Sequence, residues 1–341
     1  QIADWALRFP HNPFTVPVVA ERGEAAADHA LGLARGLATS HAAEMRQWRL
    51  ASLALTGPSD LPAQERTIAQ LRWSDLSDEE RGWCPPVLLL GDATALMEGA
   101  LPGLRRVLAS DLPIKVVLLD GRALPLAGAD AAMLGLAGRS AYVAATSVAD
   151  FDHLFASVNG AMAHAGPALL HLHTPSPTQH GFAPEQTLER ARLAVAARVH
   201  PLLRYDPAAA GVFGSRLDLN GNPNPTEDHA DEAGQALTLA AWAAGETRFA
   251  GASLAMATAE RAGHWATLRE LAGLRTPFTA RVRAEVQAEV AAAHAAELAA
   301  LKADYEGQLL AVTEATAAQQ AAKLKARLLQ LMGQARGERS N

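Results

Sequence analysis

The sequence contains the apolar stretches Pro86-Val-Leu-Leu-Leu-Gly-Asp92, Ile114-Lys-Val-Val-Leu-Leu-Asp120 and Ala168-Leu-Leu-His-Leu-His173, and these stretches decide the fold class. A helical pattern follows each of them, and two further short strands are predicted near residues 142–145 and 202–205. Short buried runs that alternate with helices are typical of β-α-β units around a parallel sheet. The sequence therefore predicts an α/β, doubly wound domain.

Composition and turn residues divide the chain into four predicted parts. An alanine-rich helical N-terminal segment, 1–83, precedes the α/β domain at 84–207, and a turn-rich and helical connection covers 208–278. A long amphipathic helix without proline follows at 279–335. Its apolar positions keep a helical spacing but no strict heptad, so we expect it to pack along a domain or to pair with another helix in a coiled coil.

Charge and cysteine content exclude several classes of protein. The net charge of −6 predicts neither a nucleic acid nor an anionic membrane as partner. No apolar stretch approaches the roughly 18 residues of a membrane span, and no signal peptide opens the chain, so a cytoplasmic protein is expected. The single cysteine, Cys84, excludes an internal disulfide and an iron–sulfur cluster ligated by this chain alone. We expect Cys84 to be buried and inert.

The tripeptide Gly91-Asp92-Ala93 follows a predicted strand and precedes a predicted helix. Ligands of doubly wound sheets bind at the carboxyl ends of strands, and a helix N-terminus favours an anion there. An aspartate at this point can hold Mg²⁺ against a diphosphate. The same aspartate can instead cap the helix, and the tripeptide alone leaves both interpretations open.

Other candidate residues have simpler interpretations. His171 and His173 alternate on a strand and therefore share a face, and with His180 they can supply imidazoles to zinc. No acidic or thiolate fourth ligand is evident, which favours strand-end and loop histidines without a metal. Asp150 and Asp152 are expected to stabilise a helix start. The chain has none of the glycine-rich or serine motifs of dinucleotide-binding proteins, phosphate loops or hydrolases.

From about residue 24 to 210, the chain resembles the C-terminal, thiamine-diphosphate-binding region of pyruvate:ferredoxin (flavodoxin) oxidoreductases. The resemblance is carried by the three stretches quoted above and by 103–110, 141–147, His180-Gly181 and 201–207. It implies a fold that binds thiamine diphosphate through Mg²⁺. The positions that would hold this cofactor are Gly91, Asp92, Ala93, Gly121 and Ala123, with Asp92 as the metal ligand.

The chain departs from this family at the functional positions. Ala93 replaces a glycine, and Gly121 stands where the family has a threonine that ligates magnesium. The polar loop over the cofactor is replaced by the apolar segment 124–130. The cysteines that bind the clusters are missing, with Ser176 near the position of one of them. The resemblance therefore implies a degenerate cofactor site.

The expected function is that of a module of a 2-oxoacid (pyruvate):ferredoxin/flavodoxin oxidoreductase-like protein, the Mg-diphosphate side of a thiamine diphosphate site. The second, pyrimidine-binding module of that family is not evident, so the chain cannot complete an active site alone. Other modules or subunits of such a complex are the expected partners. The alternative is a non-catalytic scaffold or subunit-interaction domain derived from the family, assembling as a homodimer or through its long helix. The 2-oxoacid and the electron acceptor stay open.

Overall fold

The computed structural model describes residues 18–20, 23–56, 60–122, 124, 130–227, 237–275 and 279–337. The chain forms two compact units, Gln1–Arg275 and Thr276–Asn341. The three parts predicted before residue 276 thus share one unit, while the C-terminal unit contains a single described helix, α13 (Thr279–Gly337).

The first unit is built on a seven-stranded sheet with the strand order β1-β2-β3-β5-β4-β6-β7. The first five of these are parallel to one another, as the sequence predicts, whereas β6 is antiparallel to both β4 and β7. The strands are β1 (Val18–Val19), β2 (Val87–Asp92), β3 (Ile114–Asp120), β4 (Tyr142–Ser147), β5 (Ala168–His173), β6 (Leu203–Tyr205) and β7 (Leu217–Asp218).

The direction of β6 corrects the expectation of a parallel sheet at this edge. Residues 197–202 approach β4 at its carboxyl end, where the His200 ring lies 3.0 Å from the Thr146 carbonyl oxygen. From there β6 can only run back along β4, which pairs Leu203 with Ala145 and Tyr205 with Val143. Such antiparallel pairing needs no crossover helix.

Helices cover the sheet, and most of them lie where the sequence predicts helical segments. The α-helices of this unit are α2 (Glu24–Thr56), α3 (Leu61–Ala69), α4 (Asp78–Gly82), α5 (Ala93–Gly99), α6 (Leu101–Leu108), α7 (Ala131–Gly138), α8 (Phe151–Ala163), α9 (Pro177–His180), α10 (Thr187–Ala196), α11 (Leu239–Ala243) and α12 (Ala255–Leu271). Short 3-10 helices cover Trp73–Asp75, Pro184–Gln186, Phe213–Arg216 and Thr247–Phe249.

The predicted helix caps are confirmed. The Ser77 hydroxyl accepts a hydrogen bond from the Glu80 amide, and the Glu80 carboxylate accepts one from the Ser77 amide. The Asp150 carboxylate accepts a hydrogen bond from the His153 amide at the start of α8. These side chains satisfy amides that have no partner within the helix itself.

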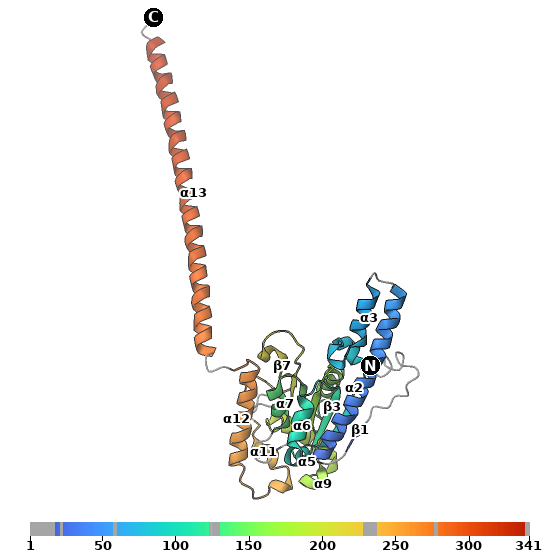
Figure 1. Ribbon diagram of the computed structural model, residues 1–341. Helices are drawn as coiled ribbons and strands as arrows, with labels where there is room; N and C mark the ends of the chain where they lie inside the picture. Colours follow the sequence, from blue (N-terminus) through green and yellow to red (C-terminus); the bar gives the residue numbers. More distant parts are fainter. Residues whose placement is uncertain are drawn as a thin grey trace. The chain divides into compact units, whose positions relative to one another are not determined.

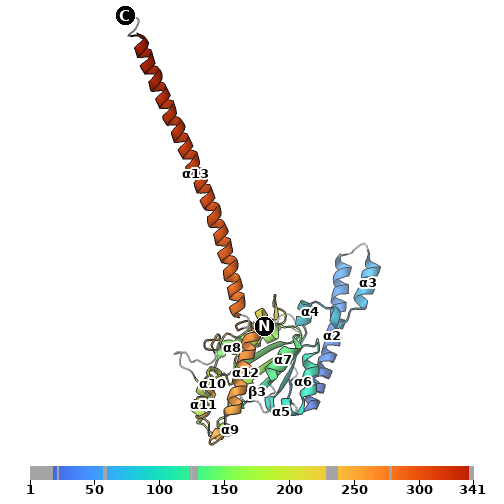
Figure 2. The same ribbon diagram turned by 90° about the vertical axis from the view of Figure 1, so that its left-hand side faces the viewer.

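The two faces of the sheet bury different side chains because neighbouring strand residues point in opposite directions. On one face, Leu118, Val143 and Leu169 join the main core with residues of α2, α6, α7 and α12. On the other face, Tyr142, Ala144 and Leu170 form a smaller cluster with α8. Figure 2 shows the strands between α8 on one side and α6 and α2 on the other.

The alanine-rich N-terminal segment belongs to the main core. In α2, Ala26, Ala27 and Ala30 are fully buried and pack in the same cluster as Val87 and Leu89 of β2. Figure 1 shows α2 running beside the sheet. Small side chains let the helix approach closely, so the segment is part of the α/β unit.

None of the helices in the described ranges is both long enough and apolar enough to cross a membrane.

Two helical glycines make a matched stability test of this packing. A Cβ at Gly135 of α7 would lie 2.7 Å from Val143 Cγ2 and 3.1 Å from Leu169 Cδ2, whereas a Cβ at Gly32 of α2 meets nothing within 4 Å. Because the buried valine has little rotamer freedom, Gly135→Ala is expected to lower the free energy of unfolding by about 1–3 kcal/mol. Gly32→Ala should raise it by about 0.5–1 kcal/mol through helix propensity.

Denaturant unfolding of both variants checks this expectation. Equal stabilities for the two variants would contradict the close approach of α7 to the sheet.

Candidate functional site

Polar side chains gather at the carboxyl ends of β3 and β5. Asp120 ends β3, and His171 and His173 lie at the end of β5. The two strands are neighbours, with Leu118 opposite His171 and Asp120 opposite His173. Strand alternation puts all three polar side chains on the face that carries Leu118 and Leu169, so they border the main core.

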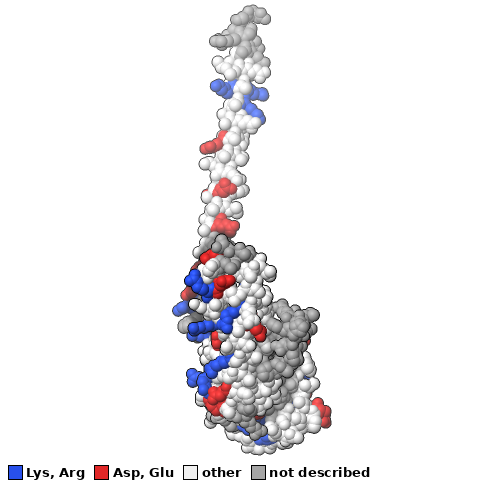
Figure 3. Space-filling model, turned by 45° about the vertical axis from the view of Figure 1, so that its right-hand side comes forward, with Lys and Arg blue, Asp and Glu red and all other residues white. Residues whose placement is uncertain are grey.

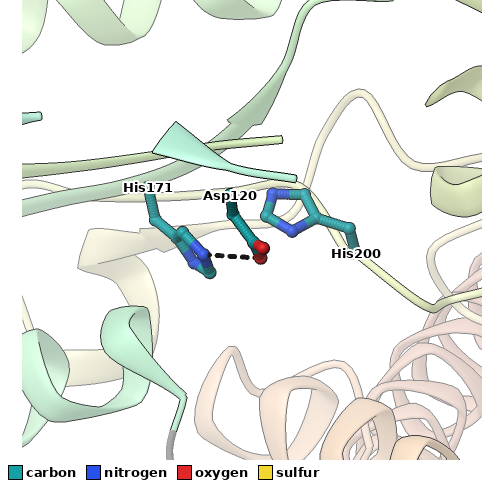
Figure 4. A group of neighbouring side chains, drawn as sticks. All are labelled: Asp120, His171 and His200. Atoms are coloured by element: carbon teal, nitrogen blue, oxygen red, sulfur yellow. Dashed lines mark hydrogen bonds and ion pairs between the residues drawn. The ribbon is translucent and has the colours of Figure 1, made fainter. Parts of the chain in front are cut away.

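A fourth polar side chain, His200, completes the group from the segment between α10 and β6. One ligand atom from each of Asp120, His171 and His200 lies within 4.8 Å of the others. Asp120 Oδ2 and His171 Nε2 are 3.0 Å apart, and Figure 4 shows the three side chains turned toward one another. The His200 ring also lies edge-on to His171, with centroids 4.9 Å apart, and stacks on His173 at 5.1 Å.

Backbone carbonyls orient two of these imidazoles. His200 Nε2 lies 3.0 Å from the Thr146 carbonyl oxygen, and His173 Nδ1 lies 3.1 Å from the Asp120 carbonyl oxygen. A carbonyl only accepts, so each ring donates through that nitrogen and, when neutral, carries its lone pair on the other. For His173 this other nitrogen, Nε2, is buried and has no hydrogen-bond partner among the described residues.

Asp120 and His171 form a buried ion pair. Burial opposes the charge on each, but the hydrogen bond and the charge of His171 hold the pKa of Asp120 well below its usual range. Burial likewise acts to lower the pKa of His171, yet the hydrogen bond and charge of Asp120, together with the charge of Asp130, raise it above the ordinary value. Each group of the pair thus favours the charged form of the other.

The other two imidazoles are neutral. Burial is the main cause that lowers the pKa of His173 to about 4 and that of His200 well below its ordinary value. The positive charge of His171 acts in the same direction on both. Neutral imidazoles are the form in which histidine binds metal ions.

Further ionisable side chains lie near this group, at the start of α7. Asp130 caps α7 by accepting a hydrogen bond from the Met133 amide, and it lies 3.7 Å from Arg261 and 3.6 Å from His264 of α12. Burial raises the pKa of Asp130, but the charges of His264, His171 and Arg261 lower it to a net value of about 2. Asp130 is therefore a second carboxylate near the strand ends.

The positions that the resemblance assigns to a diphosphate site do not form a comparable cluster of polar side chains. Asp92 is exposed at the end of β2 and caps α5, since its carboxylate accepts a hydrogen bond from the Ala95 amide. Gly91 precedes it in β2, the neighbouring Ala93 is buried, and Gly121 lies in the bend after β3. Ala123 lies outside the described residues.

The remaining residues that the sequence suggests are not among the three that share the candidate metal position. His180 ends α9, and its Nδ1 is 3.8 Å from the buried Glu246 carboxylate. The Ser176 hydroxyl contacts that of Thr178. Cys84 is buried, and burial raises its pKa to about 12, so it stays a protonated thiol as expected.

The sequence predicts two members of this group, His171 and His173, but not that Asp120 and His200 lie beside them. The shared face of His171 and His173 follows from strand alternation. The acidic partner, judged absent from the sequence, is Asp120, which sits 51 residues before His171 and is brought beside it by the pairing of β3 with β5. No local sequence pattern predicts that His200 belongs to the group. It lies between α10 and β6, and the path of the chain into β6 brings it there.

This arrangement brings one carboxylate and two imidazoles, those of His171 and His200, close to a single point that is shielded from water. Carboxylate and imidazole donors suit zinc and other first-row transition metals. Without a metal, the same groups form an ion pair flanked by neutral rings.

No protein-family model matches the chain, and no curated protein matches it in sequence.

The neutral histidines predict that the protein loses stability in mild acid. His173 and His200 stay unprotonated in the folded state well below pH 6.5, whereas the unfolded chain protonates them near pH 6.5. The unfolded state then binds more protons, so the free energy of unfolding falls as the pH drops from about 6.5 toward 4. His200→Gln should reduce this slope by about 1.4 kcal/mol per pH unit.

His171→Gln is a second variant for comparison, in which the acid slope should also fall, because the loss of the His171 charge makes His173 and His200 easier to protonate in the folded state. The pKa of His171 is raised on folding, so the ring is protonated in both states below pH 6.5 and its own protonation adds nothing to the acid slope. Its stabilising contribution is full below pH 6.5 and is lost as the pH rises through its folded pKa. Denaturant unfolding between pH 4.5 and 7, with a chelator present, measures both variants, and an unchanged slope in His200→Gln would contradict the neutral buried ring.

Proposed function

We propose that the first unit binds a divalent transition metal ion of the zinc type through Asp120, His171 and His200. The observation that carries the proposal is the convergence of three ligand atoms from three separate segments within 4.8 Å. These atoms meet at the carboxyl edge of the parallel strands, which is the edge where α/β proteins bind ligands.

The donor chemistry supports a transition metal over Mg²⁺ or Ca²⁺. Two of the three ligands are imidazoles, whereas the harder cations take oxygen ligands. In a tetrahedral zinc site with bonds of 2.0–2.1 Å, ligand atoms lie about 3.4 Å apart. The present ligand atoms lie within 4.8 Å of one another, so the side chains would have to turn inward to bind zinc at this spacing. His173, stacked on His200, offers a further nitrogen beside the three.

The contacts around the ligands are those of metal-binding histidines. Such histidines commonly donate their second ring nitrogen to a carbonyl or carboxylate, which fixes the ring and its lone pair. The bond from His200 to the Thr146 carbonyl oxygen has this form. The Asp120 carboxylate is held as well, since its Oδ1 accepts a hydrogen bond from the Arg122 amide.

The resemblance to 2-oxoacid oxidoreductases supports a broader proposal about the whole unit. We propose a non-catalytic module derived from the thiamine-diphosphate-binding region, in which a histidine–aspartate metal site stands at the ligand-binding edge. The residues present fit a magnesium-diphosphate group poorly. Among the described positions that the resemblance assigns to it, only Asp92 has a side-chain oxygen, and that carboxylate already caps α5.

Calorimetric titration of the metal-stripped chain with Zn²⁺ tests the metal proposal. We expect one ion per chain, and a loss of affinity of about tenfold or more in Asp120→Asn and in His200→Gln. His41→Gln is the matched control, because His41 is also a buried histidine bonded to a carbonyl, that of Glu80, but lies on α2. X-ray absorption of the loaded protein should give nitrogen and oxygen ligands at about 2.0–2.2 Å.

A parallel titration with Mg²⁺ and thiamine diphosphate separates the two kinds of site. Binding of that pair that disappears in Asp92→Ala, with no binding of Zn²⁺, would replace the metal proposal by the diphosphate site. Zinc binding that survives both Asp120→Asn and His200→Gln would mean that the ion sits elsewhere on the chain.

A further inference from the structure

The segment that carries His200 begins with a residue in an unusual backbone conformation. Arg198 has a φ of 57°, in the left-handed region that glycine usually occupies at this position after a helix. The turn there ends α10, and the amides of Val199 and His200 both return to the Ala194 carbonyl oxygen. The direction in which the chain leaves the helix is therefore set at Arg198. An arginine costs more free energy than glycine in this conformation, a cost that its side-chain contacts must offset.

The side chain of Arg198 is buried and bonded to the loop that follows β7. Charged side chains usually stay at the surface, where Figure 3 shows basic and acidic groups of the first unit, but Arg198 keeps 0% of its surface exposed. Its guanidinium carbon lies 4.3 Å from the centre of the Trp265 ring of α12. The same guanidinium donates hydrogen bonds to the carbonyl oxygens of Pro223 and Asn224. A planar group with several donors suits both the stacking and the bonding.

The same loop also binds the chain on the other side of His200. Asn222 is buried, and its side-chain oxygen accepts a hydrogen bond from the Leu202 amide at 2.9 Å. Its side-chain nitrogen donates to the Leu202 carbonyl oxygen at 2.7 Å. One side chain thus satisfies both polar groups of that backbone residue. Since Arg198 and Leu202 each lie two residues from His200, the loop 219–227 holds the segment 198–202 at both ends.

Helix α12 fixes the loop in its turn. Trp265 Nε1 donates a hydrogen bond to the Glu227 carbonyl oxygen at 2.8 Å. One turn further along the helix, Arg269 donates one to the Thr226 carbonyl oxygen at 2.5 Å. Trp265 therefore contacts both the loop, through its indole nitrogen, and Arg198, through its ring. Loop and segment are attached to the same rigid element.

A metal site at this position needs His200 to be held in one orientation. His200 Nε2 donates to the Thr146 carbonyl oxygen at 3.0 Å, which leaves Nδ1 as the nitrogen with the free lone pair. His200 lies between α10 and β6, outside regular secondary structure. Its place therefore depends on how its neighbours in the chain are held.

We propose that the loop 219–227 positions His200 for metal binding, with Arg198 and Asn222 as the positioning residues. This inference rests on the metal site proposed above. Neither residue is a ligand, and both act on the backbone that flanks His200. The turn-rich stretch 220–225 supplies the Asn222 side chain and the Pro223 and Asn224 carbonyl oxygens for these contacts.

Zinc titration of three variants of the metal-stripped chain tests the proposal. Arg198→Gly removes the side chain while glycine keeps the left-handed turn, and Asn222→Ala removes the hydrogen bonds to Leu202. We expect each of these variants to bind zinc about tenfold more weakly, as expected when the groups that support a metal ligand are lost. Arg139→Gly is the matched control, because Arg139 follows α7 with a φ of 60° and has an exposed side chain. The control should bind zinc like the unmodified chain.

The orientation of His200 is measured separately, without metal, by ¹H–¹⁵N NMR of the histidine side chains at neutral pH. The Nε2–H proton of His200 should exchange slowly in the unmodified chain, because it is buried and bonded to the Thr146 carbonyl oxygen. Its signal is assigned by its absence in His200→Gln. We expect fast exchange or loss of this signal in Arg198→Gly and Asn222→Ala, and a retained signal in Arg139→Gly.

The two measurements distinguish a failure of this proposal from a failure of the metal site. An unmodified chain that binds no zinc would refute the metal site, and the NMR signal would then still decide whether the loop orients His200. A His200 signal that both loop variants keep would overturn the positioning role, whether or not zinc binds. A zinc affinity that both variants leave unchanged, or that Arg139→Gly lowers equally, would overturn it as well.

Discussion

The parallel pairing of β3 with β5 is the constraint on which the rest of this structure depends. It joins two chain segments about fifty residues apart and sets their side chains in register, so that Leu118 lies beside His171 and Asp120 beside His173. Along each strand, the inner positions bury apolar side chains in the main core, and the last positions carry polar groups. A charge at such a depth needs a partner, and Asp120 has one in His171.

The ion pair also acts on its neighbours. Burial is the main reason that His173 and His200 are neutral, and a positive charge on His171 acts in the same direction. His173 and His200 can thus each donate a lone pair, with ring orientations set by backbone carbonyls of β3 and β4. The sheet supplies this rigidity, since those carbonyls belong to strand residues. A metal-binding role and a purely structural ion pair differ only in what occupies the space between these donors.

The two compact units differ in how they bury apolar side chains. The first buries its apolar side chains in a shared core to which even the alanine-rich α2 contributes. The second is a single described helix whose larger apolar side chains remain exposed. In our proposal, the first unit binds a metal ion through Asp120, His171 and His200.

The sequence by itself determined the strands β2 to β5, the helices between them, and the caps formed by Ser77 and Asp150, because these depend on local periodicity and local hydrogen bonds. It also determined that His171 and His173 share a face. It did not determine that β6 runs antiparallel, nor that Asp120 and His200 join these histidines. Strand order and the path of the segment 197–202 decide those contacts, and both arise from packing between residues far apart in the chain. Only the tertiary structure therefore assembled the site, since no local pattern encodes which strand ends become neighbours.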